Sequence, residues 1–119
     1  MDHSKDGDVT ALFERIRGEQ NGRLDIVVNC AFSGIQFLLR NRDRGCHQIT
    51  ECSPGEAWDR VNNVGLRNNY VCTIYAIRLM LDWQKDLAMA NNSVDPASAP
   101  RPGIIINMSS PGAVMYMFN

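Results

Sequence analysis

The stretch that decides the fold is Leu24-Asp25-Ile26-Val27-Val28-Asn29. It is short, β-branched at its centre and apolar without clean alternation, which is typical of a parallel strand covered by helices on both faces. The turn-forming pair Asn21-Gly22 precedes it, and a loop of small residues follows from Cys30 to Gly34. Asn29 therefore stands where this strand is expected to end.

A second apolar, β-branched stretch lies far downstream, at Ile104-Ile105-Ile106-Asn107-Met108, and it ends at Ser109-Ser110. The residues between the two stretches show helical patterns. Parallel strands need a crossover of about a dozen residues or more, usually a helix, and such crossovers are right-handed. The order helix, strand, helix, strand therefore predicts an α/β fold built around one βαβ unit with a parallel sheet.

Periodicity and one capping motif mark the helices. A first amphipathic helix is predicted over about residues 8–17 from four apolar residues at i, i+3, i+4 and i+7: Val9, Leu12, Phe13 and Ile16. In Ser53-Pro54-Gly55-Glu56, serine can cap a new helix, glutamate can return a bond to the serine N–H, and proline suits the first helical position. This helix is expected to carry Trp58 and Val61 inward and to weaken over residues 62–65. A second helical segment follows, marked by apolar residues every three or four positions: Leu66, Tyr70, Ile74, Ile77 and Leu81.

Length and composition bound the function. The chain has 119 residues, 45% of them apolar and 21% charged, with a net charge of −1, which is the balance of one globular domain. There is no basic excess for nucleic acid, no apolar run of the ~20 residues that a membrane span needs, and no targeting segment, so a cytoplasmic protein is expected. Residues 91–102 hold three of the five prolines and are predicted to form a flexible surface loop.

Metal chemistry is not expected. None of the four cysteines forms a CxxC pair, and the cluster of Cys46, His47 and Cys52 fits no common zinc spacing. Reduced cysteines are the favoured interpretation and a zinc site is the minor alternative. The sequence also contains no GxGxxG or P-loop motif, and neither histidine lies near a nucleophile.

Two polar clusters stand where chemistry is usual in open parallel sheets, just beyond the carboxyl ends of strands. They are Asn29-Cys30-Ala31 and Ser109-Ser110. Such residues are also ordinary turn formers, and by themselves the clusters favour neither explanation.

Three segments, in order and with matching spacing, resemble the short-chain dehydrogenase/reductases. Residues 23–31 (RLDIVVNCA) resemble the "LDxLVNNAG" strand of that family, residues 53–61 (SPGEAWDRV) the start of its long interface helix, and residues 103–110 (GIIINMSS) its "GxIVNxSS" strand. The resemblance implies a partial Rossmann-like, doubly wound parallel sheet, of which this chain supplies the central βαβ unit.

The same resemblance implies a function and a set of site residues. The parent enzyme would transfer a hydride between NADP or NAD and a small-molecule carbonyl or alcohol substrate. Ser110 would be catalytic, because its hydroxyl would hydrogen-bond the substrate oxygen. Asn29 and Ala31 would lie along the adenosine half of the cofactor, and Asp2 would contact adenine. The long helix from about Pro54 to Leu81 would form the dimer interface of a homo-oligomer.

The chain departs from the family pattern at several positions. Cys30 replaces the second asparagine of the strand motif, Phe32 replaces its glycine, and Gly65 replaces the asparagine of the proton relay. No glycine-rich dinucleotide loop and no Tyr-x-x-x-Lys pair occur in the 119 residues, and Tyr116 lies only six residues after Ser110. We therefore expect residues 1–119 to be a single partial NAD(P)-binding domain, truncated at both ends and inactive as it stands.

Two other interpretations stay open. The chain could be a short isoform that acts as a dimerisation module through its long helix. A flavodoxin-like binding module would explain the βαβ unit but not the three ordered motifs.

Overall fold

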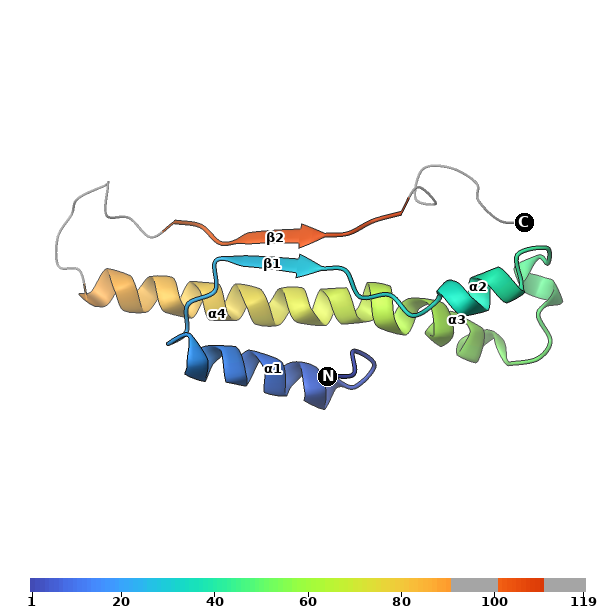
Figure 1. Ribbon diagram of the computed structural model, residues 1–119, viewed down its shortest axis with the longest axis horizontal. Helices are drawn as coiled ribbons and strands as arrows, with labels where there is room; N and C mark the ends of the chain where they lie inside the picture. The colour runs from blue at the N-terminus through green and yellow to red at the C-terminus, as the bar shows by residue number, and fades with distance from the viewer. Residues whose placement is uncertain (91–100, 111–119) are drawn as a thin grey trace.

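The computed structural model describes residues 1–90 and 101–110, which form an elongated body of 63 × 30 × 17 Å (Figure 1). The elements, in chain order, are α1 (Asp6–Glu19), β1 (Ile26–Asn29), α2 (Ile35–Arg40), a short 3₁₀ turn (Cys46–Gln48), α3 (Pro54–Asn62), a π-type turn (Asn63–Arg67), α4 (Asn68–Ala90) and β2 (Ile104–Asn107). Most of the loop predicted over residues 91–102, and Tyr116, lie outside the described residues.

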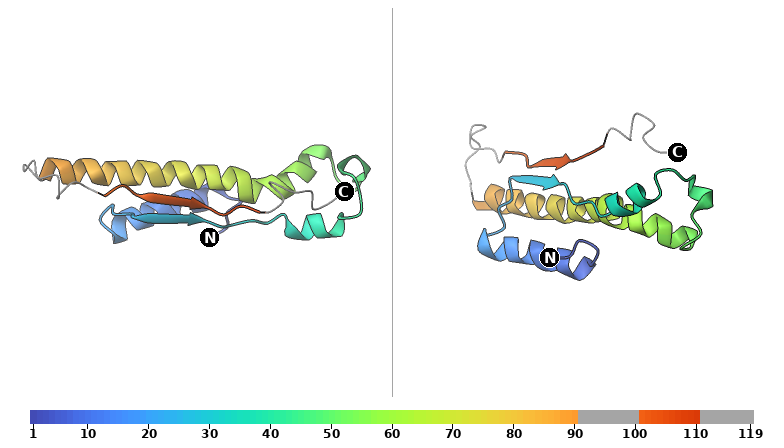
Figure 2. Two further views of the ribbon diagram at one scale, coloured as in Figure 1. Left: turned by 90° about the horizontal axis from the view of Figure 1, so that it is seen from above. Right: turned by 45° about the vertical axis from the view of Figure 1, so that its right-hand side comes forward.

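The two strands are parallel neighbours, with Ile26 paired to Ile104 and Asn29 to Asn107. The chain crosses from β1 to β2 through α2, α3 and the long α4, and α1 and α4 lie on one side of the strand pair (Figures 1 and 2). The predicted α/β class and its βαβ unit are confirmed. The predicted stop after the first helix is also found, because α1 ends at Glu19 and Asn21 and Gly22 both adopt positive φ, at 50° and 80°.

The core lies between α1 and α4. Six apolar side chains are buried there: Val9, Phe13, Cys72, Ala76, Leu79 and Met80. Val27 and Ile105 pack against them from the strands, and the rings of Phe13 and Tyr75 stack with their centroids 5.5 Å apart. The apolar stripe predicted for the first helix therefore faces inward, as its spacing indicated.

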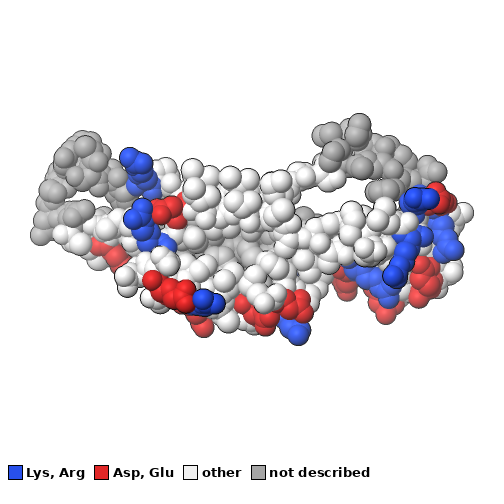
Figure 3. Space-filling view, viewed as in Figure 1, with Lys and Arg blue, Asp and Glu red and all other residues white. Residues whose placement is uncertain are grey.

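The opposite face of the strand pair is apolar and exposed. Alternate residues of both strands point away from α4: Ile26, Val28, Ile104 and Ile106. On the face seen in Figure 3, charged side chains gather toward the ends and lower edge of the molecule, leaving the strand region without them. The near-continuous apolar strands thus match the pattern of strands covered on both faces, but the described residues cover one face.

One expectation for the helices needs correction. Trp58 was expected to point inward, yet its residue is 62% exposed, because α3 packs on α2 and on the π-type turn rather than on the core. The periodic stripe that marked the second segment lies mainly outside, with Leu66, Tyr70, Ile77 and Leu81 all exposed. The buried face of α4 is a different one, formed by Asn68, Cys72, Ala76, Leu79 and Met80.

The start and the break of the helical segment that begins at Pro54 agree with the sequence. Ser53 Oγ accepts a hydrogen bond from Glu56 N at 3.2 Å, and Glu56 Oε2 accepts from Ser53 N at 2.8 Å, which completes the capping box. The weakening predicted at residues 62–65 is a true break, since Val64 and Gly65 have non-helical backbone angles. The helix then resumes and runs to Ala90.

Candidate functional site

The candidate site is the edge of the sheet at which β1 and β2 both end, called here the carboxyl edge. Beyond the last strand pair, Met108 N donates to Asn29 O at 2.9 Å, so backbone hydrogen bonding between the two strands continues to their ends. Cys30 and Ala31 follow from β1, and Ser109 and Ser110 follow from β2. The parallel register thus brings the two polar clusters of the sequence to one edge, as ligand sites of open parallel sheets require.

Asn29 joins three elements at this edge. Its Nδ2 donates to Asn107 Oδ1 of β2 at 2.8 Å and to Thr73 Oγ1 of α4 at 3.0 Å. A longer contact of 3.4 Å reaches the carbonyl of Asn69. Only 6% of Asn29 is exposed, so its amide group is committed to holding the strand ends on α4.

Asp2 lies in an N-terminal loop that its own carboxylate organises. Asp2 Oδ1 accepts from Ser4 N at 2.9 Å and from Ser4 Oγ at 2.7 Å, and Asp2 N donates to Asp8 Oδ2 at 2.7 Å. The two bonds from Ser4, led by the one from its backbone, hold the pKa of the Asp2 carboxyl below its usual value, and Lys5 adds a smaller effect of the same sign. The group is therefore an exposed, ionised acceptor.

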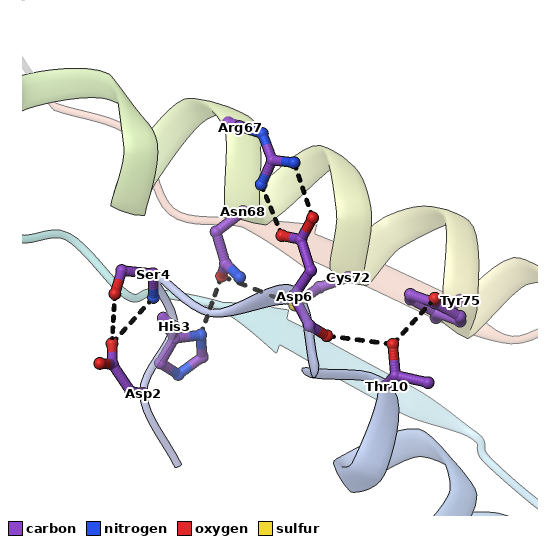
Figure 4. Close-up of polar contacts among 9 residues, drawn as sticks. All are labelled: Asp2, His3, Ser4, Asp6, Thr10, Arg67, Asn68, Cys72 and Tyr75. Atoms are coloured by element: carbon purple, nitrogen blue, oxygen red, sulfur yellow. Dashed lines mark hydrogen bonds and ion pairs between the residues drawn. The ribbon is translucent and has the colours of Figure 1, made fainter. Parts of the chain in front are cut away.

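The N-terminal loop is tied to the first turn of α4 (Figure 4). His3 Nδ1 and Asn68 Oδ1 lie 2.8 Å apart, and the Cys72 thiol contacts the same oxygen at 3.6 Å. Arg67 forms a two-bond pair with the carboxylate of Asp6, at 2.6 and 2.7 Å. Asn29 reaches the same turn through Asn69, so the loop of Asp2 and the end of β1 meet at the start of α4.

Sequence reasoning missed this junction. The two residues joined by the His3 contact are 65 positions apart, and so are Thr10 and Tyr75, whose hydroxyls lie 3.0 Å apart. No local pattern marks such pairs, and His3 was set aside as a terminal residue without a nearby nucleophile. The only sequence signal was the group of four asparagines at residues 62, 63, 68 and 69 around the helix break.

No metal centre was predicted, and within residues 1–90 and 101–110 no group of three or more His, Cys, Asp and Glu side chains could hold a metal ion. Burial raises the pKa of the Cys72 thiol, which opposes thiolate formation there. None of the helices in the described part of the chain is both long and apolar enough to cross a membrane.

The geometry defines a class of protein: an α/β chain with a parallel βαβ unit and polar residues at its carboxyl edge. No family model matches the chain. Its resemblance to the short-chain dehydrogenase/reductases is nevertheless confirmed by individual proteins of that class.

The chain is 39% identical over 118 residues to human "Dehydrogenase/reductase SDR family member 1" and 37% identical over 118 residues to the mouse protein of the same name. Each match covers 99% of this chain and 31% of the relative. The chain thus spans about a third of the length of the curated relatives it matches.

Proposed function

We propose that this chain is part of an NAD(P)-dependent short-chain oxidoreductase, which transfers a hydride between a nicotinamide cofactor and a carbonyl or alcohol carbon. The observation that supports this most directly is the parallel register, which places Asn29, Ala31 and Ser110 at one edge of the sheet. The likeness to two dehydrogenase/reductases along the whole chain supports the same reaction class.

Each site residue has a distinct proposed role. The Ser110 hydroxyl donates a hydrogen bond to the substrate oxygen, where negative charge develops during reduction. Asp2 accepts from the exocyclic amine of adenine, a role that suits a carboxylate whose pKa is lowered and whose side chain is half exposed. Asn29 acts by position, because its amide holds the strand ends beside which Ala31 lines the cofactor path.

Asp2, Asn29 and Ala31 would hold the adenosine end of a dinucleotide, and the nicotinamide cofactor, when bound, supplies or accepts the hydride. The 119 residues contain no glycine-rich phosphate loop and no Tyr-x-x-x-Lys pair to provide a general acid. We therefore propose that these 119 residues do not catalyse the reaction by themselves. An assay with both NADPH and NADH and with several carbonyl compounds would identify the cofactor and the substrate.

The first experiment is the intact mass of the endogenous protein, captured with an antibody against residues 53–69. A species of about twice the 13.3 kDa of this chain or more would direct the assay to that protein. It would then be tested for oxidation of NADPH or NADH in the presence of carbonyl compounds. Activity with neither cofactor across aldehydes and ketones would refute the proposed reaction.

Two neighbouring serines provide a matched pair of variants. Ser110→Ala should lower kcat by about 10²–10³-fold, the usual cost of removing one donor to a developing oxyanion. Ser109→Ala is the same chemical change one residue earlier in the chain and should leave kcat within about twofold. Equal effects of the two variants would contradict the assignment of Ser110.

A second candidate function, a dimerisation module, is favoured by the exposed stripe on the interface helix. Trp58, Leu66 and Tyr70 are 62%, 61% and 68% exposed, and with Asn62 and Arg67 they line a groove of about 360 Å³. Apolar surface of this kind on a helix is typical of a protein–protein contact. A chain of this length that paired with the longer enzyme through the stripe would form a mixed dimer.

Co-purification tests this alternative. The tagged 119-residue chain would be mixed at micromolar concentration with the longer protein, and Tyr70→Glu would be compared with Lys85→Glu on the same helix. Pairing that is lost with Tyr70→Glu alone would support the module. Failure of the unaltered chain to pair would exclude it.

A further inference from the structure

One edge of the Phe32 ring lies against two glycines. A β-carbon built on Gly34 would stand 2.6 Å from Phe32 Cζ, and one built on Gly65 would stand 2.7 Å from Phe32 Cδ2. Real β-carbons essentially never approach another atom so closely, so the ring occupies the space that a side chain at either position would need. The ring therefore fits here because both neighbours are glycines.

The backbone around the ring is shaped to receive it. Gly65 has φ 157° and ψ −60°, and Val64 before it has φ −109° and ψ 90°, which together break the helix between α3 and α4. Ser33 N, next to Phe32, donates to Val64 O at 3.1 Å and fastens the loop to this break. Phe32 is thus held by a backbone hydrogen bond beside it and by the helix break against which one edge of its ring packs.

Phe32 and Ser110 both lie beyond the carboxyl edge of the paired strands. Asn29 and Asn107 are the last paired residues, and Phe32 and Ser110 each follow one of them by three positions in the sequence. The residue is 48% exposed although one ring edge is covered by the glycines, so the rest of the ring remains accessible. A rigid aromatic surface therefore borders the edge at which a ligand would bind.

We propose that Phe32 determines substrate specificity, with the accessible part of its ring forming an apolar wall for a flat, apolar group of the carbonyl substrate. The covered edge of the ring also fills the space beside Gly65, so a larger residue at position 65 could not extend its side chain into the site. The inference rests on the proposed function and deepens it: the substrates favoured are aryl or other bulky apolar aldehydes and ketones rather than small aliphatic ones. Aromatic contacts of this kind prefer stacked or edge-to-face arrangements, which a fixed ring provides.

The test uses the longest endogenous form of the protein and two substrate types, an aryl ketone and a short aliphatic aldehyde. Phe32→Leu keeps a bulky apolar side chain on the glycines and removes the aromatic surface, so folding should be preserved. It should raise KM for the aryl ketone about 3- to 10-fold, which corresponds to the usual worth of an aromatic pair, and leave kcat within about twofold. KM for the aliphatic aldehyde should change by less than about twofold. Phe32→Tyr, which keeps an aromatic ring, should have the same KM for the aryl ketone as the unaltered protein.

Phe37→Ala, which removes an aromatic ring from α2 beside Arg60, is the matched control and should not alter the ratio of the two KM values. Equal changes for both substrates in Phe32→Leu, or no change for either, would overturn the assignment while leaving the proposed reaction intact. Absence of any nicotinamide-dependent activity in the unaltered protein would instead remove the proposed function and this inference together.

Discussion

Replacing Asn29 with alanine tests whether its buried amide holds the carboxyl edge together. The variant loses two hydrogen bonds from Nδ2, at 2.8 Å to Asn107 and 3.0 Å to Thr73. Each bond contributes about 0.5–1.5 kcal/mol to the free energy of unfolding, which sets a range of about 1–3 kcal/mol. Asn107 is exposed, so water can satisfy its freed oxygen, and the lower half of that range is expected.

The assay is thermal unfolding of the purified protein, followed by the circular dichroism of its helices. A loss of about 1 kcal/mol lowers Tm by roughly 4–8 °C in small domains, so Asn29→Ala should lower Tm by on the order of 5–10 °C. Asn62→Ala is the matched control, because the Asn62 amide makes one exposed bond, at 3.1 Å to Trp58 O within its own helix. The control should change the free energy of unfolding by no more than about 0.5 kcal/mol. Equal melting of the two variants would refute the claim that Asn29 joins the strands to α4.

Two further predictions concern packing and pH. Gly103→Ala should lower the free energy of unfolding by about 1–3 kcal/mol, because its new β-carbon would overlap the buried Met80 thioether. Gly55→Ala should raise the free energy of unfolding by about 0.4–1 kcal/mol, because its β-carbon would point into open space on a helix. Urea unfolding of both variants checks the opposite signs of the two effects. The two-bond pair with Arg67 lowers the pKa of Asp6 from its usual 3.8, so the stability it adds is present above that pKa and is lost as the pH falls through the folded-state value. The Tm difference between the unaltered protein and Asp6→Asn should therefore be constant near neutral pH and shrink below about pH 4, and a difference that grows on acidification would contradict this assignment.

Much of the backbone plan could be predicted from short stretches of sequence. Ser53 to Glu56 contain every group of a capping box, and the box forms where the four residues predict it. The strand of residues 26–29 and the turn at Asn21-Gly22 likewise depend on residues that are close neighbours in the sequence. The meeting of the two polar clusters at one edge could also be predicted, because parallel strands must end at one edge and their last residues could be read directly.

What sequence patterns left open or got wrong is equally local in origin. The regular stripe of Leu66, Tyr70 and Ile77 predicts a helix with an apolar face, but it does not say which face is buried, and α4 buries another. Trp58 was expected inside because large aromatic residues gain most from burial, yet α3 lies beyond the end of the core. Periodicity shows that a face exists, and only packing shows which face a neighbouring element covers.

By itself, then, the sequence determined the order of elements, the βαβ unit, the helix cap and the two polar clusters, because each depends on residues close together in the chain. Only the tertiary structure decided that the Asn29 amide turns inward to Asn107 and Thr73, that His3 meets Asn68, and that Phe32 takes the space beside Gly65. These contacts join residues from 33 to 78 positions apart, and whether two such residues meet is set by how whole elements pack rather than by any pattern within one of them.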